Sequence, residues 1–269
     1  MHITNTISQK FHTFATTQFF QPIQNIINTG YVKLLGLDMS EFESPNNYKT
    51  LNALFTRALK KPREFDTSNN TFISPADSFV SASGDIQKDT ALQIKGMSYN
   101  IEDLLTLYCY KGYKKLLDGK FMNFYLSPKD YHRYHLSYDA TITKLIHVPG
   151  KLYPVNFVYL NKQKDLFLEN ERVIIECKTV TNRYFYMVFV GALNVGKMVF
   201  TFEPRVKTNT NTRSVSVYKY DNLSLKKGDC LGYFEMGSTV LIFWEKDMVE
   251  LEDLENQKVN YTKIIAKNL

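Results

Sequence analysis

Four short stretches of the sequence place reactive side chains where turns are expected. In the first, Ser74–Ser78, Pro75 fixes the backbone just ahead of the carboxylate of Asp77. Taken alone, an aspartate in this position is typical of a turn in which the side chain hydrogen-bonds to its own backbone. The other three stretches are Leu126–His135, Val190–Lys197 and Gly228–Val240.

The second stretch contains His132 and His135, two of the five histidines in the chain, three residues apart. Such a pair can bind a metal ion from one face of a helix, but the Ser127-Pro128 turn and the alternating tyrosines argue against a helix here. No further ligands follow at a recognisable spacing. Because histidine takes and gives protons near neutral pH, an acid–base role is favoured over a metal site.

The third and fourth stretches contain closely spaced glycines. Gly191 and Gly196 could cradle a phosphate, but their spacing is neither that of a dinucleotide-binding loop nor that of a P-loop. Close packing of the backbone explains them equally well. In Gly237-Ser238-Thr239, the glycine lacks the Cβ that would crowd its own carbonyl, so the Ser238 hydroxyl can approach that carbonyl from the side. Taken alone, this tripeptide is also typical of a turn or a bulge.

The elements that must position these residues are expected to form a mostly antiparallel β core. From about Lys61 onward, short apolar runs alternate with turn signals, which is typical of a sandwich or a barrel-like fold. One helix is expected within this core, over Ile101–Leu117. With helices predicted upstream, the fold class is α+β. The expected strands are Phe121–Leu126, Ala140–Val148, Arg172–Lys178, Tyr184–Val190, Met198–Phe202, Ser214–Tyr220 and Thr239–Trp244.

The N-terminal part is predicted to be helical, because apolar residues recur there at three- and four-residue steps. Pro22 separates two such runs, and a further helix is expected over Leu51–Leu59, with Asn46 or Asn47 as its N-cap. Residues 11–32 carry no formal charge but are too polar to span a bilayer. The apolar faces either pack on the core or enter a membrane surface. The residues that would act as wedges in a membrane are Phe14, Phe19 and Phe20.

Composition limits the class of protein. The chain has 269 residues, of which 44% are hydrophobic and 22% charged, so it can bury a core and is not a disordered chain. Its formal charge of +6 permits an anionic partner such as a phospholipid surface or a nucleic acid. Cys109, Cys177 and Cys230 form no CxxC pair, which favours free thiols in a reducing compartment. No signal peptide is expected, because the N-terminus lacks a basic start followed by an apolar run.

Together, the four stretches resemble the phosphatidylserine decarboxylases, a family that makes its own pyruvoyl cofactor. The resemblance extends from about Tyr48 to Trp244 and keeps the family's motifs in order. Ser78 stands where glycine is usual and Met236 where leucine is usual; both departures are local and touch no reactive group. The matching motifs are Pro75-Ala76-Asp77, Leu126–His135, Asn170-Glu171-Arg172-Val173, Val190-Gly191-Ala192 and Gly237-Ser238-Thr239.

The resemblance implies two reactions. In the first, Ser238 attacks the carbonyl of Gly237, with His135 as the base and Asp77 orienting and charging that base. The chain is thereby cut into residues 1–237 and 238–269, and Ser238 becomes a covalent pyruvoyl group. In the second reaction, this group accepts the electrons released as CO2 leaves phosphatidylserine, which yields phosphatidylethanolamine. His132 is the candidate for contacting the substrate carboxylate or for delivering a proton, and no metal is implied.

The resemblance also implies partners and a location. Residues 1–60 are expected to form a helical membrane-associating region and residues 61–269 the catalytic core. The protein is expected to lie peripherally on the cytoplasmic face of the inner membrane, as a homodimer whose fragments stay associated, and to bind no nucleic acid. One alternative is a β-rich module that binds a membrane surface and never cleaves itself. Another is a pyruvoyl decarboxylase that acts on a soluble amino acid or on S-adenosylmethionine.

Overall fold

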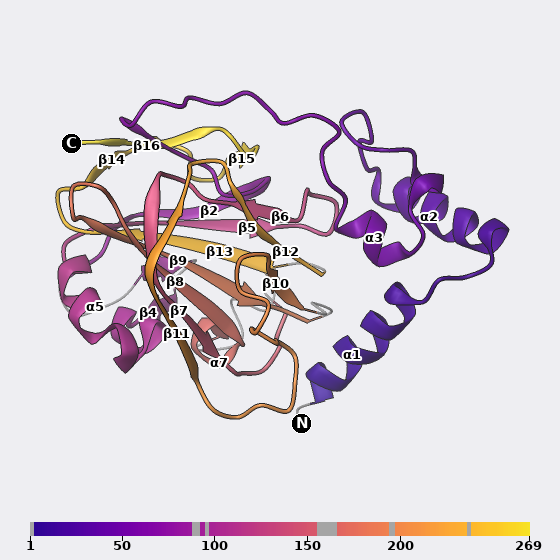
Figure 1. Cartoon of the computed structure of the whole chain (residues 1–269), viewed down its shortest axis with the longest axis horizontal. Coiled ribbons are helices and arrows are strands. Elements are labelled where there is room, and N and C mark those ends of the chain that lie inside the picture. Colours follow the sequence, from indigo (N-terminus) through magenta and orange to yellow (C-terminus); the bar gives the residue numbers. More distant parts are fainter. Residues whose placement is uncertain (1–2, 88–91, 95–96, 155–165, 194–196, 236–237) are drawn as a thin grey trace.

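The computed structural model describes residues 3–87, 92–94, 97–154, 166–193, 197–235 and 238–269. The N-terminal helices form an arm beside the β core (Figure 1). The two predicted helical runs before and after Pro22 are confirmed, and the helix predicted over Leu51–Leu59 is present but ends at Phe55. The expected N-cap at Asn46 or Asn47 is wrong. Both residues lie in a 3-10 turn, and the hydroxyl of Thr50 instead caps the following helix by accepting from the N–H of Ala53 at 3.0 Å. The elements of the arm are α1 (Ile3–Thr16), α2 (Gln21–Leu35), η1 (Pro45–Asn47) and α3 (Leu51–Phe55).

The core is built on an eight-stranded antiparallel sheet in the order β11-β7-β8-β9-β13-β5-β2-β15. Its order begins at β11 and ends at β15, so it is an open sheet, and the predicted mostly β, α+β fold is confirmed. The strands of this sheet are β2 (Ser78–Asp85), β5 (Lys120–Leu126), β7 (Ala140–Val148), β8 (Arg172–Lys178), β9 (Tyr184–Gly191), β11 (Ser216–Leu225), β13 (Ser238–Trp244) and β15 (Lys258–Val259).

Smaller sheets cover one face of the large sheet. One has the order β1-β16-β14 and another β10-β12-β6, and both pack their apolar side chains into the same cluster as the large sheet. A further pair, β3 and β4, forms a separate ladder. The bounds are β1 (Thr71–Ile73), β3 (Leu92–Ile94), β4 (Met97–Tyr99), β6 (Arg133–His135), β10 (Met198–Phe200), β12 (Cys230–Phe234), β14 (Val249–Leu251) and β16 (Ile264–Asn268).

Short helices cover the other face. Along β13, Val240 and Ile242 pack toward the small sheets, whereas Leu241 and Phe243 pack toward the helices, as the two-residue period of a strand dictates. The helix predicted over Ile101–Leu117 is broken at Thr106, whose φ of 67° is incompatible with a continuous helix. The bounds are α4 (Ile101–Leu105), η2 (Leu107–Cys109), α5 (Tyr110–Leu116) and α7 (Leu166–Glu169).

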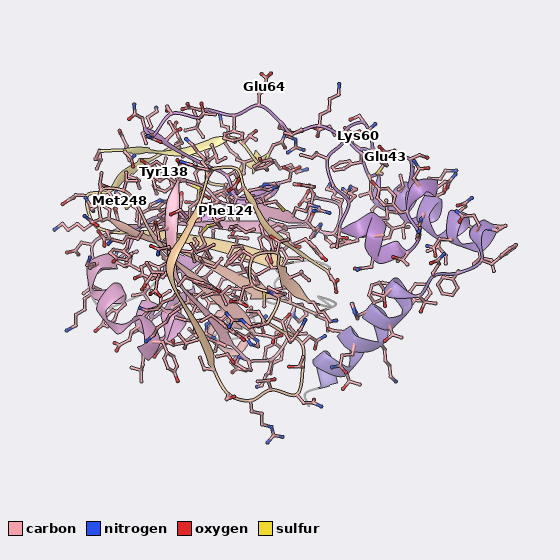
Figure 2. All side chains as sticks on the ribbon, viewed as in Figure 1. Glu43, Lys60, Glu64, Phe124, Tyr138 and Met248 are labelled. Atoms are coloured by element: carbon pink, nitrogen blue, oxygen red, sulfur yellow. The ribbon has the colours of Figure 1, made fainter. Side chains whose placement is uncertain are left out.

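Side-chain packing follows the same division. Figure 2 shows Phe124, Tyr138 and Met248 among the side chains of the β core, where all three are buried. Lys60 and Glu64 project from the exposed segment that connects α3 to β1. The division into domains after residue 60 stays a prediction. Among the described helices, none is long and apolar enough to cross a membrane.

Candidate active site

Ser238 is the first residue of β13, a central strand of the large sheet. Its backbone pairs with Leu126 on one side and with Gly191 on the other. The strand register therefore brings together the ends of three motifs that are far apart in the sequence. Gly237 lies outside the described residues, and only the backbone of Ser238 is described.

The Asn170-Glu171-Arg172-Val173 motif holds Gly191 beside Ser238. The side-chain amide of Asn170 donates to the carbonyl of Gly191 at 2.8 Å, and the N–H of Gly191 donates to the carbonyl of Glu171 at 2.9 Å. A Cβ on Gly191 would lie 3.0 Å from the side chain of Leu152. The packing explanation for this glycine is therefore supported, and the motif acts as a scaffold for the start of β13.

The histidine stretch begins with a closed turn rather than a helix. The carboxylate of Asp130 accepts from the N–H of Ser127 at 2.7 Å, and the N–H of Asp130 donates to the Ser127 carbonyl at 2.9 Å. The chain then enters β6, which pairs with β12. The carbonyl of His132 accepts from the N–H of Phe234 at 3.0 Å, only four residues before Ser238.

His132 is fully buried against the ring of Phe55, with ring centroids 4.0 Å apart. Its Nδ1 lies 2.7 Å from the carbonyl oxygen of Asp130, which can only accept, so Nδ1 carries the proton. Nε2 is buried and has no hydrogen-bond partner among the described residues. Burial lowers the pKa of His132 to about 3, so at neutral pH the ring is uncharged and Nε2 presents a free lone pair.

His135 is also buried, but both of its ring nitrogens have partners. Nδ1 donates to the carbonyl of Gly228 at 2.9 Å, and Nε2 accepts from the hydroxyl of Tyr131 at 3.1 Å. Gly228 has a φ of +87°, and a Cβ there would lie 2.4 Å from the ring of Phe65, so only glycine fits at this position. Burial lowers the pKa of His135 to about 4, which leaves it neutral at pH 7.

Asp77 makes long-range contacts rather than the local turn contact that its stretch alone suggests. Its two carboxylate oxygens accept from Arg63 at 2.5 and 3.0 Å, and Oδ1 also accepts from the N–H of Tyr261 at 2.7 Å. The ring of Tyr261 is stacked on that of His135, with centroids 3.7 Å apart and planes inclined by 14°. Asp77 and His135 are thus linked through Tyr261 in this structure. Their predicted roles stay predictions.

The chain is similar in sequence to known proteins over most of its length. A sequence profile described as phosphatidylserine decarboxylase matches residues 51–267. A phosphatidylserine decarboxylase proenzyme from Helicobacter pylori is 42% identical over 268 residues, which is 98% of this chain and 97% of the relative. This chain belongs to the phosphatidylserine decarboxylase family. The proenzyme from Campylobacter jejuni is 39% identical over 96% of this chain and 97% of its own, and that from Idiomarina loihiensis is 37% identical over 83% and 78%.

Two polar groups lie on the histidine stretch that follows β5. Ser127 follows directly after Leu126, the strand partner of Ser238, and its side chain interacts with the carboxylate of Asp130. The Nε2 atom of His132 is buried and has no hydrogen-bond partner among the described residues. This unused lone pair is the feature of the region that fits a small polar group at residue 238.

Sequence reasoning missed three residues of this decarboxylase-family site. Arg63 also bonds Glu41, at 2.8 and 2.7 Å, so it ties Asp77 to the N-terminal segment. Tyr261 lies 184 residues from Asp77. Glu235 contacts Asn52 of α3 at 3.2 Å and His12 of α1 at 3.1 Å. The sequence carries no local signal for these contacts, because each joins segments that only the fold brings together.

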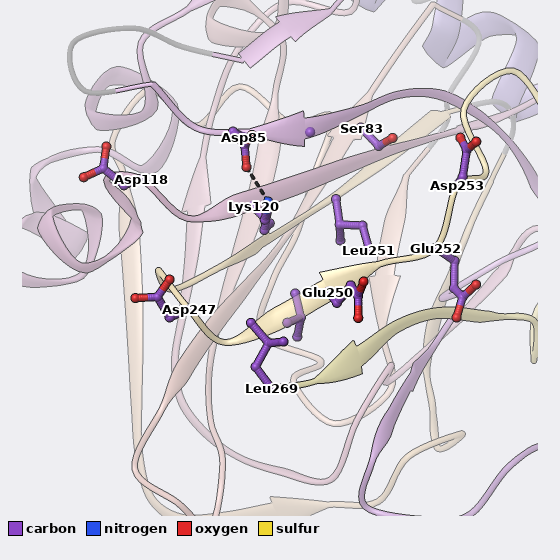
Figure 3. Close-up of a pocket in the computed structure, with 12 residues that line it drawn as sticks. Ser83, Asp85, Asp118, Lys120, Asp247, Glu250, Leu251, Glu252, Asp253 and Leu269 are labelled. Atoms are coloured by element: carbon purple, nitrogen blue, oxygen red, sulfur yellow. Dashed lines mark hydrogen bonds and ion pairs between the residues drawn. The ribbon is translucent and has the colours of Figure 1, made fainter.

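An open pocket lies at the opposite end of the same strands (Figure 3). It has a volume of about 660 Å3 and is lined mainly by carboxylates, with Lys120 paired to Asp85. Lys120 pairs with Trp244, at the far end of β13 from Ser238. An acidic pocket repels an anionic lipid, so this hollow is not the site of the family's chemistry.

Proposed function

We propose that this chain decarboxylates phosphatidylserine to phosphatidylethanolamine, using a pyruvoyl group formed when the chain cuts itself between Gly237 and Ser238. The relatives named as phosphatidylserine decarboxylase proenzymes support this proposal. The observation that carries it is the strand register, which places Ser238 between Leu126 and Gly191, at the meeting point of the family's motifs.

In the self-cleavage, the hydroxyl of Ser238 gives its proton to a base, and its Oγ forms a bond with the carbonyl carbon of Gly237. The C–N bond breaks, so the peptide becomes an ester and residue 238 gains a free amino group. Elimination then removes the Cα proton of residue 238 and breaks the bond between its Cβ and the ester oxygen, which leaves a carboxylate at residue 237 and a dehydroalanine at residue 238. The dehydroalanine tautomerises to an imine, and water hydrolyses the imine to a ketone and ammonia, so a pyruvoyl group remains.

His135 is the proposed base and Asp77 its positioning residue. The Nδ1–H bond to Gly228 leaves Nε2 of His135 as the proton-accepting atom, and that atom now accepts from Tyr131. To act on Ser238, His135 must exchange the Tyr131 hydroxyl for the Ser238 hydroxyl. Asp77 supports the ring indirectly, because it fixes the backbone of Tyr261, whose ring stacks on His135.

His132 is the proposed proton carrier of the decarboxylation. The pyruvoyl group supplies a carbonyl that reacts with the substrate amine and draws in the electrons of the broken C–C bond. The amine must first lose its proton, and Nε2 of His132 has an unused lone pair that can receive it. Because burial lowers the pKa of His132 to about 3, the ring does not keep this proton but passes it on. The same nitrogen can return a proton to the carbon that has lost CO2.

The helical arm is the proposed membrane contact. In α2 part of the apolar surface faces outward. Ile26 is 73% and Leu34 84% exposed while Gln24 and Asn28 are buried, and Ile27 is one of the apolar residues that pack inward. The side-chain amide of Asn28 donates to the carbonyls of Pro45 and Tyr48, both at 2.9 Å, so the polar face holds the following loop. An apolar face left outward by this arrangement suits the interface of a bilayer. Other exposed apolar residues on the arm are Ile7, Phe14, Phe20 and Ile23.

The experiment that tests the proposed function is intact-mass spectrometry of the purified protein. The 31.3 kDa chain should separate under denaturing conditions into two fragments, of which the smaller is about 3.7 kDa and begins with a pyruvoyl group. The preparation should release CO2 from phosphatidylserine in vesicles and leave free serine unreacted. An active preparation that consists of one unbroken chain with an ordinary serine at position 238 would refute the proposal.

A further inference from the structure

Arg57 is a buried cation with unused hydrogen-bond donors. It lies two residues after α3 and is 3% exposed. Its Nη2 donates to the carbonyls of Lys129 at 3.1 Å and of Asp130 at 3.3 Å, whereas Nε and Nη1 have no partner among the described residues. Asp77 and Asp130 attract the charge of Arg57, but no described group accepts from these two nitrogens. Buried donors of a charged side chain that have no acceptor are costly, so this arrangement calls for an acceptor from outside the described residues.

A second buried arginine shows what a purely structural role looks like. Arg172 is 4% exposed, and each of its three nitrogens donates to a backbone carbonyl, those of Leu104, Leu168 and Asp103, at 2.7 to 2.9 Å. Every nitrogen of the Arg172 guanidinium thus has an acceptor inside the protein. Arg57 is equally buried but leaves two of its three nitrogens free, which is the pattern of a ligand-binding fork.

Arg57 lies next to His132. The carbonyl oxygen of Asp130 accepts from both residues, at 2.7 Å from His132 Nδ1 and 3.3 Å from Arg57 Nη2. The two side chains are therefore held on one backbone atom of the histidine motif. Aromatic rings pack on both side chains. The Arg57 guanidinium lies 4.4 Å from the ring centroid of Phe42, and the ring of Phe55 packs on that of His132.

The helical arm contacts the same loop. The hydroxyl of Tyr31, in α2, donates to the carbonyl of Pro128 at 3.2 Å, one residue before the Lys129 carbonyl that Arg57 contacts. Arg57 thus contacts the same loop as the proposed membrane contact and the proposed proton carrier. A lipid held by the arm would present its head group at this position.

We propose that Arg57 binds the phosphodiester of the lipid head group and thereby sets the serine moiety beside His132 and residue 238. This inference rests on the proposed function. The phosphodiester fits better than the serine carboxylate for a kinetic reason. The carboxylate loses its charge as CO2 leaves, so a guanidinium bound to it would favour the ground state and slow the reaction. The phosphodiester keeps its charge throughout, so binding it costs nothing in the chemical step.

The test is the kinetics of Arg57→Gln and Arg57→Lys in self-cleaved enzyme, on short-chain phosphatidylserine. The loss of two charge-assisted hydrogen bonds should raise KM about tenfold to a hundredfold and change kcat far less. Arg183→Gln is the control, because Arg183 contacts Glu245 and backbone carbonyls at the far end of the sheet. An unchanged KM in both Arg57 variants would overturn the inference, whereas absence of a pyruvoyl group or of decarboxylation in the wild type would overturn the proposed function.

Two soluble probes separate the phosphodiester from the carboxylate. Glycerophosphoethanolamine carries the phosphodiester and the amine without a carboxylate, and serine carries the carboxylate without a phosphate. The inhibition constant of glycerophosphoethanolamine should rise in Arg57→Gln by the same factor as KM, while that of serine stays constant. A loss confined to serine would assign Arg57 to the carboxylate and overturn the inference.

Binding to the uncut chain keeps the test valid if the arginine variants fail to process. Glycerophosphoethanolamine is titrated calorimetrically into Ser238→Ala and into Ser238→Ala with Arg57→Lys, both checked for a cooperative thermal transition. Binding should be detectable in the first and weakened at least tenfold in the second. Equal binding in two folded proteins would overturn the inference.

Discussion

The two ends of strands β5 and β13 differ in a way that locates the chemistry. At the end marked by Lys120 and Trp244 lies an open pocket lined with carboxylates. Each end has buried polar atoms without a hydrogen-bond partner among the described residues, but they differ in kind. At the Trp244 end one of them is the indole N–H of Trp244, a neutral donor, whereas at the end marked by Leu126 and Ser238 they belong to groups that can carry charge, His132 Nε2 and two nitrogens of Arg57. A hollow on the surface costs the protein little, whereas an unpaired buried polar atom destabilises it. The second end is therefore the one that function must explain.

The largest expected effect comes from removing the nucleophile. Ser238→Ala should leave a single uncut chain with no decarboxylation, because no hydroxyl remains to form the ester. Ser83→Ala, at the pocket end, is the matched control and should process normally. Mass spectrometry of both variants checks this, and a cut Ser238→Ala chain would remove the serine from its role.

The next effect comes from Asp77. Asp77→Ala frees Arg63 from a close contact and releases the N–H of Tyr261, so the support of His135 is lost. Self-cleavage should slow about a thousandfold or more. Asp85→Asn breaks an ion pair at the pocket end and should cleave at the wild-type rate. Gel time courses after synthesis measure both rates, and wild-type cleavage in Asp77→Ala would contradict the assignment.

His132 should separate the two reactions. His132→Gln is expected to self-cleave, since His135 retains its contacts, but to decarboxylate about a hundredfold to a thousandfold more slowly. Glu250→Gln, which lines the acidic pocket, is expected to leave both reactions unchanged. Release of labelled CO2 from phosphatidylserine vesicles provides the measurement. Normal turnover in His132→Gln would assign the proton transfer elsewhere.

A smaller effect is expected at the helical arm. Ile26→Ser and Leu34→Ser each remove an exposed apolar side chain worth about 1.5 to 3 kcal/mol when fully buried, so together they should weaken vesicle binding at least tenfold. Leu107→Ser is the control, because Leu107 is 75% exposed but lies in η2, outside the arm. Co-sedimentation with anionic vesicles compares them. Equal loss in all three would mean that the arm has no special part in docking.

The last prediction concerns the free energy of unfolding, which should change gradually with pH. The pKa values of His132 and His135 lie at about 3 and 4 in the folded state, against 6.5 when unfolded. Between pH 6.5 and those values the unfolded chain binds more protons, so the free energy of unfolding should fall as the pH falls, by up to about 1.4 kcal/mol per pH unit for each histidine. Denaturant titrations from pH 7.5 to 4.5 measure the slope. His132→Gln should reduce it, and an unchanged slope would contradict the burial of a neutral ring.

The sequence predicts the central strands of the large sheet well because β5, β8, β9 and β13 are apolar runs whose burial is nearly complete. It does not predict β2, whose serines interrupt the apolar pattern. The runs Arg172–Lys178 and Thr239–Trp244 correspond to β8 and β13 with at most one residue of difference. The break at Thr106 was missed, since the apolar spacing continues across it while the backbone does not. Arg57, Arg63 and Tyr261 were missed for another reason. Their partners lie 14 to 184 residues away, and only the fold brings them into contact.

The position of β13 has a consequence for the cut chain. This strand begins at the expected break and lies between β5 and β9. The segments that follow it pair with the preceding part of the chain twice more, β15 with β2 and β16 with β1. We expect the two fragments of a cleaved molecule to stay together in solution. Release of the shorter fragment would require β13 to break its hydrogen bonds with the strands on both of its sides. Cleavage at this position would create a new chain terminus inside the sheet and leave the shorter fragment bound.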